Sequence, residues 1–186
     1  MADGRLAGKF IVVGVTGGVA AFKAAHLVTG LRKLGAEVHV VMTPGAAQFI
    51  SPLTFRALSQ HPVVTDLWDP QNPDDEPHVA LGERADLFVI APVTAHMLAK
   101  LALGLADDAV SATALASRAP LLLAPAMSDT MYEHPTTQEH VTALHRRGVR
   151  TIGPVVGWLA SGKEAIGRMA EPDAILEEIC AILEAK

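Results

Sequence analysis

The sequence predicts an α/β fold: a doubly wound, Rossmann-like (flavodoxin-like) parallel sheet with helices on both faces, in a three-layer sandwich. Two observations predict it. Short strand-like runs are apolar throughout, which is typical of strands buried on both faces, and they alternate with alanine-rich helical stretches. Right-handed crossovers between such strands give a doubly wound sheet, which binds ligands at the carboxyl ends of its strands.

Five short apolar runs are expected to form the strands. In chain order they are residues 9–15, 37–42, 86–91, 120–124 and 150–153. Since the longest apolar stretch holds about nine residues and a membrane-spanning helix needs about 20, we expect no membrane segment.

Helical spacing and end signals predict the helices between these strands. They are residues 19–34, short helices within 43–60 interrupted by Pro44 and Pro52, a helix after His78, residues 95–105, a helix ending at Gly148, and residues 172–184. Thr136 and Glu139 have the spacing of a capping box. Residues 66–77 are the most loop-like, and residues 155–169 are glycine-rich and expected to be irregular.

Length and composition limit the function classes. The 186 residues fit one domain, 1–186, with a flexible lid at about 155–170. The net charge of −5 argues against nucleic acid as a partner. The single cysteine, Cys180, excludes an internal disulfide, and the polar N-terminus does not resemble a signal peptide, so we expect a cytoplasmic protein.

The loop after the first strand is rich in glycine and leads into a helix. It contains Gly14, Thr16, Gly17, Gly18, Val19 and Ala20. Glycines permit close approach to a phosphate, and the helix N-terminus supplies N–H groups. The spacing matches neither GxGxxG nor a P-loop, and Met42-Thr43 stands where a dinucleotide fold carries an acid, which favours a mononucleotide over NAD. The alternative is a packing turn.

One later segment also follows a strand, and an acidic pair follows the helix after it. Thr94 is expected to cap a helix, and its hydroxyl with the imidazole of His96 is suited to holding a flat heterocycle. Asp107 and Asp108 are either metal ligands or, as we favour, a capping turn. No HExxH or Cys/His spacing indicates a metal site.

Three further features have both a functional and an ordinary interpretation. Met127 and Met131 are either core residues or an apolar flap over a ligand. Residues 157–169 are either a flexible lid that attracts anions or a surface loop. His78 is one of eight histidines and a candidate general acid or base.

Together these motifs resemble the flavin-dependent cysteine decarboxylases, which include the phosphopantothenoylcysteine decarboxylases of coenzyme A biosynthesis. The matching segments are 14–24 (GVTGGVAAFKA), 40–55 (VVMTPGAAQFISPLTF), His78 with 85–108, 124–138 (APAMSDTMYEHPTTQ) and 157–172 (GWLASGKEAIGRMAEP). The nearest likeness is to the decarboxylase half of a bacterial bifunctional enzyme. Five motifs in order over nearly the whole chain make the resemblance specific.

The resemblance implies FMN as cofactor and a cysteine-derived substrate. It places the FMN phosphate on the loop from Gly14 to Ala20 and on Thr43, and it implies His78 as general base. It places the isoalloxazine ring near a second set of residues: Phe49, Pro92, Val93, Thr94, His96, Ser111 and Thr113. Met127 and Ser128 are then expected to bind substrate, with Lys163 and Arg168 near its phosphate.

The implied reaction oxidises the thiol to a thioaldehyde, which acts as electron sink for loss of CO₂, and then reduces the enethiolate to give 4′-phosphopantetheine. Three departures bear on this reaction. His96 stands at an asparagine-like place, Ser128 stands where the family carries an asparagine for the substrate carboxylate, and Ser161 replaces a cysteine that protonates the intermediate. Serine offers one donor where an amide offers two, and it is a much weaker acid than cysteine.

Two alternatives remain open: oxidative decarboxylation of a peptide C-terminal cysteine to an enethiol, and a non-catalytic FMN-binding regulatory protein. A relative that forms prenylated flavin is a weaker alternative. The family also implies a homotrimer or a multiple of trimers, such as a dodecamer, and a separate synthetase chain as partner.

Overall fold

The computed structural model describes residues 4–69 and 76–185. Its central sheet is parallel and has six strands in the order β3-β2-β1-β4-β5-β6. The strands are β1 (Phe10–Val15), β2 (Glu37–Met42), β3 (Val63–Val64), β4 (Leu87–Val93), β5 (Leu121–Pro125) and β6 (Arg150–Thr151). This is the order of the Rossmann fold rather than the 2-1-3-4-5 order of flavodoxin, and the predicted doubly wound α/β class is confirmed.

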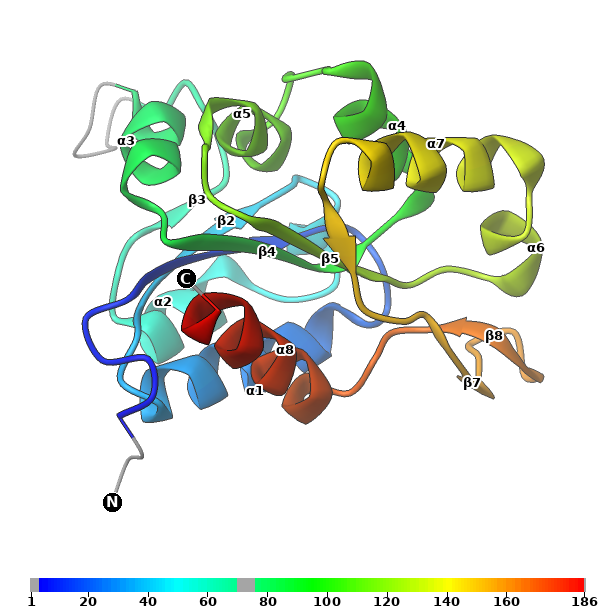
Figure 1. The fold of residues 1–186 in the computed structure, drawn as a ribbon, viewed down its shortest axis with the longest axis horizontal. Helices are drawn as coiled ribbons and strands as arrows, with labels where there is room; N and C mark the ends of the chain where they lie inside the picture. The colour runs from blue at the N-terminus through cyan, green and yellow to red at the C-terminus, as the bar shows by residue number, and fades with distance from the viewer. Residues whose placement is uncertain (1–3, 70–75, 186) are drawn as a thin grey trace.

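Helices cover both faces of the sheet (Figure 1). One face carries α1 (Ala21–Lys33), α2 (Pro52–Ser59) and α8 (Pro172–Glu184). The other carries α3 (Pro77–Arg84), α4 (Ala95–Leu103), α5 (Ala109–Ala116) and α7 (Pro135–Arg146). Two short helices, η1 (Ala46–Gln48) and α6 (Asp129–Tyr132), lie in loops that follow strands.

The helical faces bury two aliphatic cores, one on each side of the sheet. Leu27 and Ile179 belong to the core under α1 and α8, and Leu98 and Val141 belong to the core under α4 and α7. Cys180 is fully buried in the first core. Because strands β1 and β4 are buried along their whole length, their carboxyl ends are held firmly, and the loops that follow them have fixed starting points.

Two local predictions were wrong, and one short strand was missed. The helix expected after the Thr136 capping box begins at Pro135, and its N-cap is His134, whose Nδ1 accepts from Thr136 N at 3.2 Å. Proline suits the first helical position because its φ is already helical, so Thr136 lies inside the helix. Pro52 likewise begins α2 instead of interrupting a helix. The two-residue strand β3 was not predicted.

Residues 155–169, expected to be irregular, form an antiparallel hairpin of β7 (Val155–Trp158) and β8 (Glu164–Arg168). A Cβ at Gly157 would lie 2.7 Å from Arg168 Cδ, so glycine makes room for the arginine that crosses it. Figure 1 shows the hairpin projecting from one end of the sheet beside α6.

Among residues 4–69 and 76–185, no helix has both the length and the apolar character needed to cross a membrane. The predicted loop 66–77 lies partly outside the described residues.

Candidate functional site

The loops after β1 and β4 meet at the carboxyl edge of the sheet, and Thr16 joins them. Its buried hydroxyl donates to Pro92 O at 2.8 Å and accepts from Thr94 N at 3.1 Å. These strands are neighbours, yet the chain leaves β1 toward β2 and β3 on one side and β4 toward β5 and β6 on the other. Thr16 therefore lies at the switch point, where open α/β sheets bind ligands.

The N-terminus of α1 opens onto this switch point. Its N-cap, Ala20, makes no side-chain hydrogen bond, and its first turn holds no acid, so the helix dipole favours an anion here. The N–H groups of Ala21 and Lys23 already donate to Gly18 O and Ala20 O. A Cβ at Gly17 would lie 2.8 Å from the carbonyl carbon of Gly45, so only glycine lets the two loops pack this closely. At Gly18 the nearest atom is Thr94 Cγ2 at 3.8 Å, which leaves space beside the helix.

A cavity of about 540 Å³ lies between these loops, the β5–α6 loop and the hairpin. The structure brings nine of the predicted residues to its wall. They are Gly17, Gly18, Val19, Ala20, Thr94, Met127, Ser128, Ser161 and Arg168. The four motifs that contribute them are far apart in sequence, so the fold assembles them into one site.

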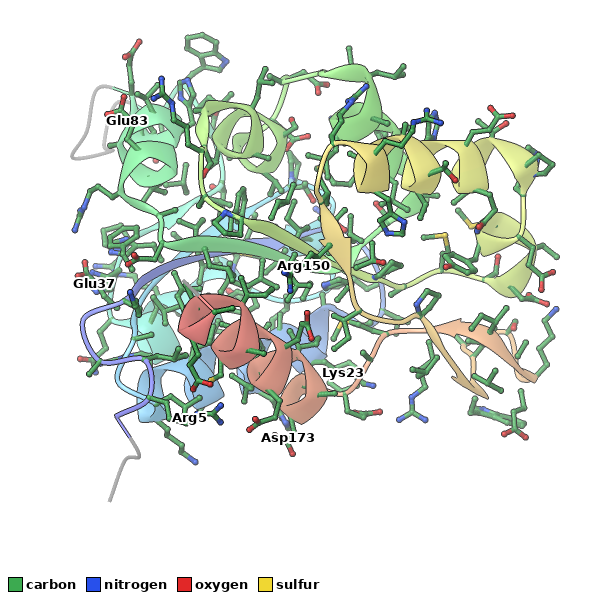
Figure 2. All side chains as sticks on the ribbon, viewed as in Figure 1. Arg5, Lys23, Glu37, Glu83, Arg150 and Asp173 are labelled. Atoms are coloured by element: carbon green, nitrogen blue, oxygen red, sulfur yellow. The ribbon has the colours of Figure 1, made fainter. Side chains whose placement is uncertain are left out.

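Lys23 also lines the cavity, although the sequence analysis assigned it no role at the site. Its Nζ lies 2.9 Å from Glu171 Oε1, and Arg168 Nη2 lies 2.6 Å from the same oxygen. The hydrogen bond from Lys23 lowers the pKa of Glu171 below its ordinary value, despite some burial. Figure 2 shows Lys23 beside the start of α8. Two cations thus share one carboxylate at the cavity. The sequence did carry a signal for Lys23, namely a cation in the first helical turn after the glycine-rich loop.

Exposed apolar side chains form part of the same wall. Phe22, Met131 and Trp158 line the cavity and are 56%, 48% and 69% exposed. The sequence analysis considered Met131 as part of a flap but missed Phe22. An apolar wall with few polar groups is typical of sites for small organic ligands.

Two bonds attach the hairpin to the β5–α6 loop and to the first residue of α6. Met127 N donates to Gly167 O at 3.0 Å, and Lys163 Nζ lies 2.6 Å from Asp129 Oδ2. Gly167 has φ +133°, and a Cβ there would collide with Met127 O. The hydrogen bond from Lys163 lowers the pKa of Asp129 below its ordinary value. Lys163 is therefore directed at Asp129 and does not line the cavity.

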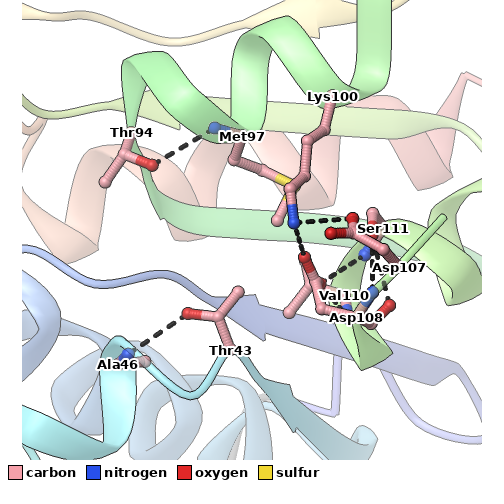
Figure 3. Close-up of polar contacts among 9 residues, drawn as sticks. All are labelled: Thr43, Ala46, Thr94, Met97, Lys100, Asp107, Asp108, Val110 and Ser111. Carbon is pink, nitrogen blue, oxygen red and sulfur yellow. Dashed lines mark hydrogen bonds and ion pairs between the residues drawn. The ribbon is translucent and has the colours of Figure 1, made fainter. Parts of the chain in front are cut away.

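Several predicted cofactor residues have structural roles in this chain. Gly14 is packed in the core, where a Cβ would lie 3.0 Å from Val110 Cγ1. Thr43 Oγ1 accepts from Ala46 N at 3.1 Å, as Figure 3 shows. Thr113 Oγ1 donates to Ala109 O at 2.7 Å.

Figure 3 also shows the contacts of Ser111, which forms a capping box with Asp108 at the start of α5. Lys100 Nζ lies 2.7 Å from Asp107 and 2.6 Å from Asp108. Burial lowers the pKa of Lys100, but the hydrogen bonds to both aspartates outweigh it and raise the pKa overall. The favoured interpretation of Asp107-Asp108 as a capping turn is confirmed. Thr94 likewise caps α4, accepting from Met97 N at 3.3 Å.

Four more predicted cofactor residues do not line the cavity. Pro92 and Val93 are buried in β4, whereas His96 is exposed at the start of α4. Phe49 is 56% exposed.

His78 lies in a different place from the other predicted catalytic residue, Ser161. It is the second residue of α3 and lines a separate cavity of about 540 Å³ with Trp68 and Leu115. Its Nδ1 is buried and has no hydrogen-bond partner within the described part of the chain. The structure of one chain does not bring His78 to the cavity that Ser161 lines.

Comparisons with known proteins bear on this site. A model of the flavoprotein family matches residues 2–184. The coenzyme A biosynthesis bifunctional protein CoaBC of Haemophilus influenzae is 47% identical over 171 residues, which cover 92% of this chain and 43% of that protein. The chain thus spans less than half the length of the curated relatives it matches.

Solved structures have the same architecture. A cysteine-to-serine mutant of PPC decarboxylase, in complex with pantothenoylaminoethenethiol, superposes with a TM-score of 0.85 at 32% identity, covering 95% of this chain and 98% of that one. The FMN-dependent cysteine decarboxylase SpaF has a TM-score of 0.82, also at 32% identity, covering 96% of this chain and 98% of that one.

Proposed function

The chain belongs to the flavoprotein family, and from this premise we propose that it is an FMN-dependent carboxy-lyase that converts 4′-phosphopantothenoylcysteine to 4′-phosphopantetheine in coenzyme A biosynthesis. The observation that carries the proposal is the cavity at the switch point, where an uncapped helix N-terminus meets an apolar wall and two cations. The similarity to CoaBC and to PPC decarboxylase supports the substrate.

The residues at this cavity fit FMN. The N–H groups at the start of α1, with Gly17 and Gly18 beside them, suit a phosphomonoester. The wall contributed by Thr94, Met127 and Trp158 suits a flat ring. When bound, FMN supplies the oxidising power for the substrate thiol and the electrons for the final reduction. The structural neighbour SpaF is named an FMN-dependent cysteine decarboxylase, which supports FMN as the flavin.

We propose that Arg168 and Lys23 neutralise the anionic groups of the substrate. Both already share Glu171 at the cavity, so an incoming carboxylate or phosphate would replace a carboxylate that they bind now. Lys163, which the sequence also assigned to the phosphate, must leave Asp129 before it can do so. Met127 and Ser128 lie where they can contact the cysteine end of the substrate.

The carbon–carbon bond breaks after the thiol has become a thioaldehyde, because the thiocarbonyl accepts the electron pair left by CO₂. We propose that His78 takes the proton removed in the oxidation. Ser161 lies on the exposed turn of the hairpin at the cavity, where it can hydrogen-bond the enethiolate. Its hydroxyl is a poor proton donor, so water or another group protonates the intermediate.

We further propose that the site is completed by a neighbouring copy in a homotrimer or a multiple of trimers. His78 lines a separate cavity, so a second chain is needed to bring it to the flavin. Large apolar side chains are exposed at both cavities, Val19 and Phe22 at the first and Leu115 at the second. Phe49, Leu53, Leu103 and Leu105 are exposed as well, and exposed apolar surface of this kind is typical of an oligomer interface.

The proposed reaction also implies a partner enzyme, and the sequence bears on the cellular location. A synthetase that joins phosphopantothenate to cysteine must supply the substrate, and we propose it as the functional partner. We propose a cytoplasmic location, because a chain with a single cysteine cannot form an internal disulfide.

A second function is favoured by two specific observations. SpaF is as similar in sequence as PPC decarboxylase, and the PPC decarboxylase mutant with serine in place of a cysteine was solved with an aminoethenethiol. Since Ser161 stands at a cysteine position of the family, oxidative decarboxylation of a peptide C-terminal cysteine to an enethiol is the alternative.

A substrate comparison tests the proposal. The flavin-loaded protein is given 4′-phosphopantothenoylcysteine or a peptide ending in cysteine, and kcat/KM is measured from CO₂ release. We expect the phosphorylated substrate to be preferred, and the reverse preference would replace the proposal with its alternative. Arg168→Gln should raise KM for the phosphorylated substrate and leave that for the peptide nearly unchanged.

A further inference from the structure

Three metal-ligating side chains meet at the opposite edge of the sheet from the cavity. Glu37 and His39 are the first and third residues of β2, so their side chains leave the same face. Gln60 ends α2 with φ +63°, and the chain then reaches His61, two residues before β3, the strand that pairs with β2. Figure 2 shows Glu37 at this edge, far from Lys23 at the cavity.

The three side chains are already in contact or close to it. His39 Nε2 lies 3.0 Å from Glu37 Oε1. The His39 ring is stacked between Phe10 and His61, with ring centroids 4.5 and 4.1 Å away. One ligand atom from each of Glu37, His39 and His61 lies within 4.8 Å of the other two.

We propose that Glu37, His39 and His61 bind one divalent transition-metal ion of the Zn²⁺ class. Two imidazoles and one carboxylate form a donor set that suits zinc and leaves a fourth position for water. Ligand atoms about 2.0–2.1 Å from a tetrahedral ion lie about 3.3 Å apart. The Glu37–His39 pair therefore has to open only slightly, and the His61 ring turns out of its stack to direct a nitrogen at the ion.

The surroundings both favour and oppose a cation. The His39 side chain is only 14% exposed, so an ion bound there would be partly shielded from water, and the carboxylate of Glu37 beside it would offset the positive charge of the ion. Arg84 is the opposing charge, because its Nη2 lies 3.2 Å from Glu37 Oε1 and its guanidinium stacks on Phe10. The ion replaces part of this ion pair, so we expect micromolar rather than tighter binding.

The ion would join β2 to the weakest strand of the sheet. Strand β3 has two residues and pairs with β2 at only two positions. An ion bound by both His39 and His61 would link the two ends of the segment between them. That segment carries Thr43 and Phe49 toward the carboxyl edge of the sheet. Because the ion binds the folded arrangement, it stabilises the fold by mass action.

Titration of the flavin-loaded full chain with ZnCl₂, followed by calorimetry and by thermal unfolding, tests the proposal. We expect one ion per chain and a rise in Tm. Substitution of a ligand residue should weaken Zn²⁺ binding by at least about 10–100-fold, because that loss is already known for residues that only hydrogen-bond to a metal ligand. His61→Ala and Glu37→Gln should both show this loss. His26→Ala removes an exposed histidine on α1 and is the matched control, with unchanged affinity.

Three results would overturn the proposal. The first is that the unmodified protein binds Zn²⁺ no more tightly than His61→Ala does. The second is that His26→Ala loses as much Zn²⁺ affinity as the ligand variants. The third is that Zn²⁺ still raises the Tm of both His61→Ala and Glu37→Gln. The flavin spectrum of each variant reports whether it is folded. Since Glu37→Gln keeps the shape of the side chain, it separates loss of a ligand from loss of packing.

Discussion

Lys163 Nζ lies 2.6 Å from Asp129 Oδ2, so the ion pair bonds the turn of the β7–β8 hairpin to the first residue of α6. The hairpin carries Ser161 and Arg168, which line the cavity. Together with the bond between Met127 N and Gly167 O, this pair holds the hairpin in place. The lysine that the sequence assigned to substrate therefore positions other residues in this state of the molecule.

Removing the Lys163 charge should loosen the hairpin. Lys163→Met is expected to speed limited proteolysis within residues 155–168, while Tm changes little, because an exposed ion pair contributes weakly to global stability. Lys33→Met, on α1, is the control and should be cleaved at the wild-type rate. Equal cleavage rates in all three proteins would contradict a restraining role for Lys163.

The Lys163–Asp129 bond should also set a pH limit. The hydrogen bond from Lys163 lowers the pKa of Asp129 below 3.8. A carboxyl with a depressed pKa stabilises the folded arrangement above its unfolded value and loses this contribution as pH falls through the folded value. The hairpin is therefore expected to stay attached at neutral pH and to loosen as the pH falls through the lowered pKa of Asp129. NMR titration of the Asp129 carboxyl should give a higher pKa in Lys163→Met, whereas an unchanged midpoint would refute the link.

Thr16→Val should destabilise the junction of β1 and β4. The substitution keeps the shape but leaves Thr94 N and Pro92 O without the buried hydroxyl that pairs them. The cost is expected to be about 1–3 kcal/mol in the free energy of unfolding, measured with urea. Thr16→Ser retains the hydroxyl and should lose much less, so equal losses in the two variants would show that the hydroxyl is unimportant.

Two neighbouring glycines should respond differently to alanine. Gly17→Ala places a Cβ 2.8 Å from the backbone of Gly45, and we expect a loss of about 1–3 kcal/mol in unfolding free energy from overpacking. Gly18→Ala meets its nearest atom at 3.8 Å and should be close to neutral. Denaturation of both variants provides the comparison, and a larger loss at Gly18 would contradict the packing described for the two loops.

His78 should act on the flavin of a neighbouring chain. His78→Asn is expected to keep its flavin spectrum and to lose about 10²–10⁴ in kcat. Gly18→Asp should fold but lose flavin, because its carboxylate would stand beside the helix N-terminus that we propose as the phosphate site. Mixed oligomers of the two inactive variants should regain activity, since an intact His78 then faces an intact flavin site. Verified mixed oligomers that remain inactive would rule out sharing between chains.

Elements with local signals were predictable from the sequence. Strand Glu37–Met42 and helix Pro172–Glu184 have the predicted bounds, because apolar periodicity and a proline at the first turn define them locally. The loop with Gly17 and Gly18 was also expected at the site, and both residues line the cavity, whereas binding of a phosphate there stays a prediction.

Features that depend on distant residues were not predictable. Strand β3 exists only through its pairing with β2, and the hairpin only through pairing of β7 with β8. The sharing of Glu171 by Lys23 and Arg168, and the approach of His61 to His39, each require the folded chain. No spacing rule relates these positions.

The central claim is tested most directly by the product formed from 4′-phosphopantothenoylcysteine. The FMN-loaded protein is incubated with this substrate without oxygen, and CO₂ and product mass are followed together. We predict one CO₂ per turnover and the mass of 4′-phosphopantetheine. A product lighter by about two mass units, the enethiol, would contradict only the final reduction. Absence of CO₂ from a protein that holds its flavin would contradict the proposed activity itself.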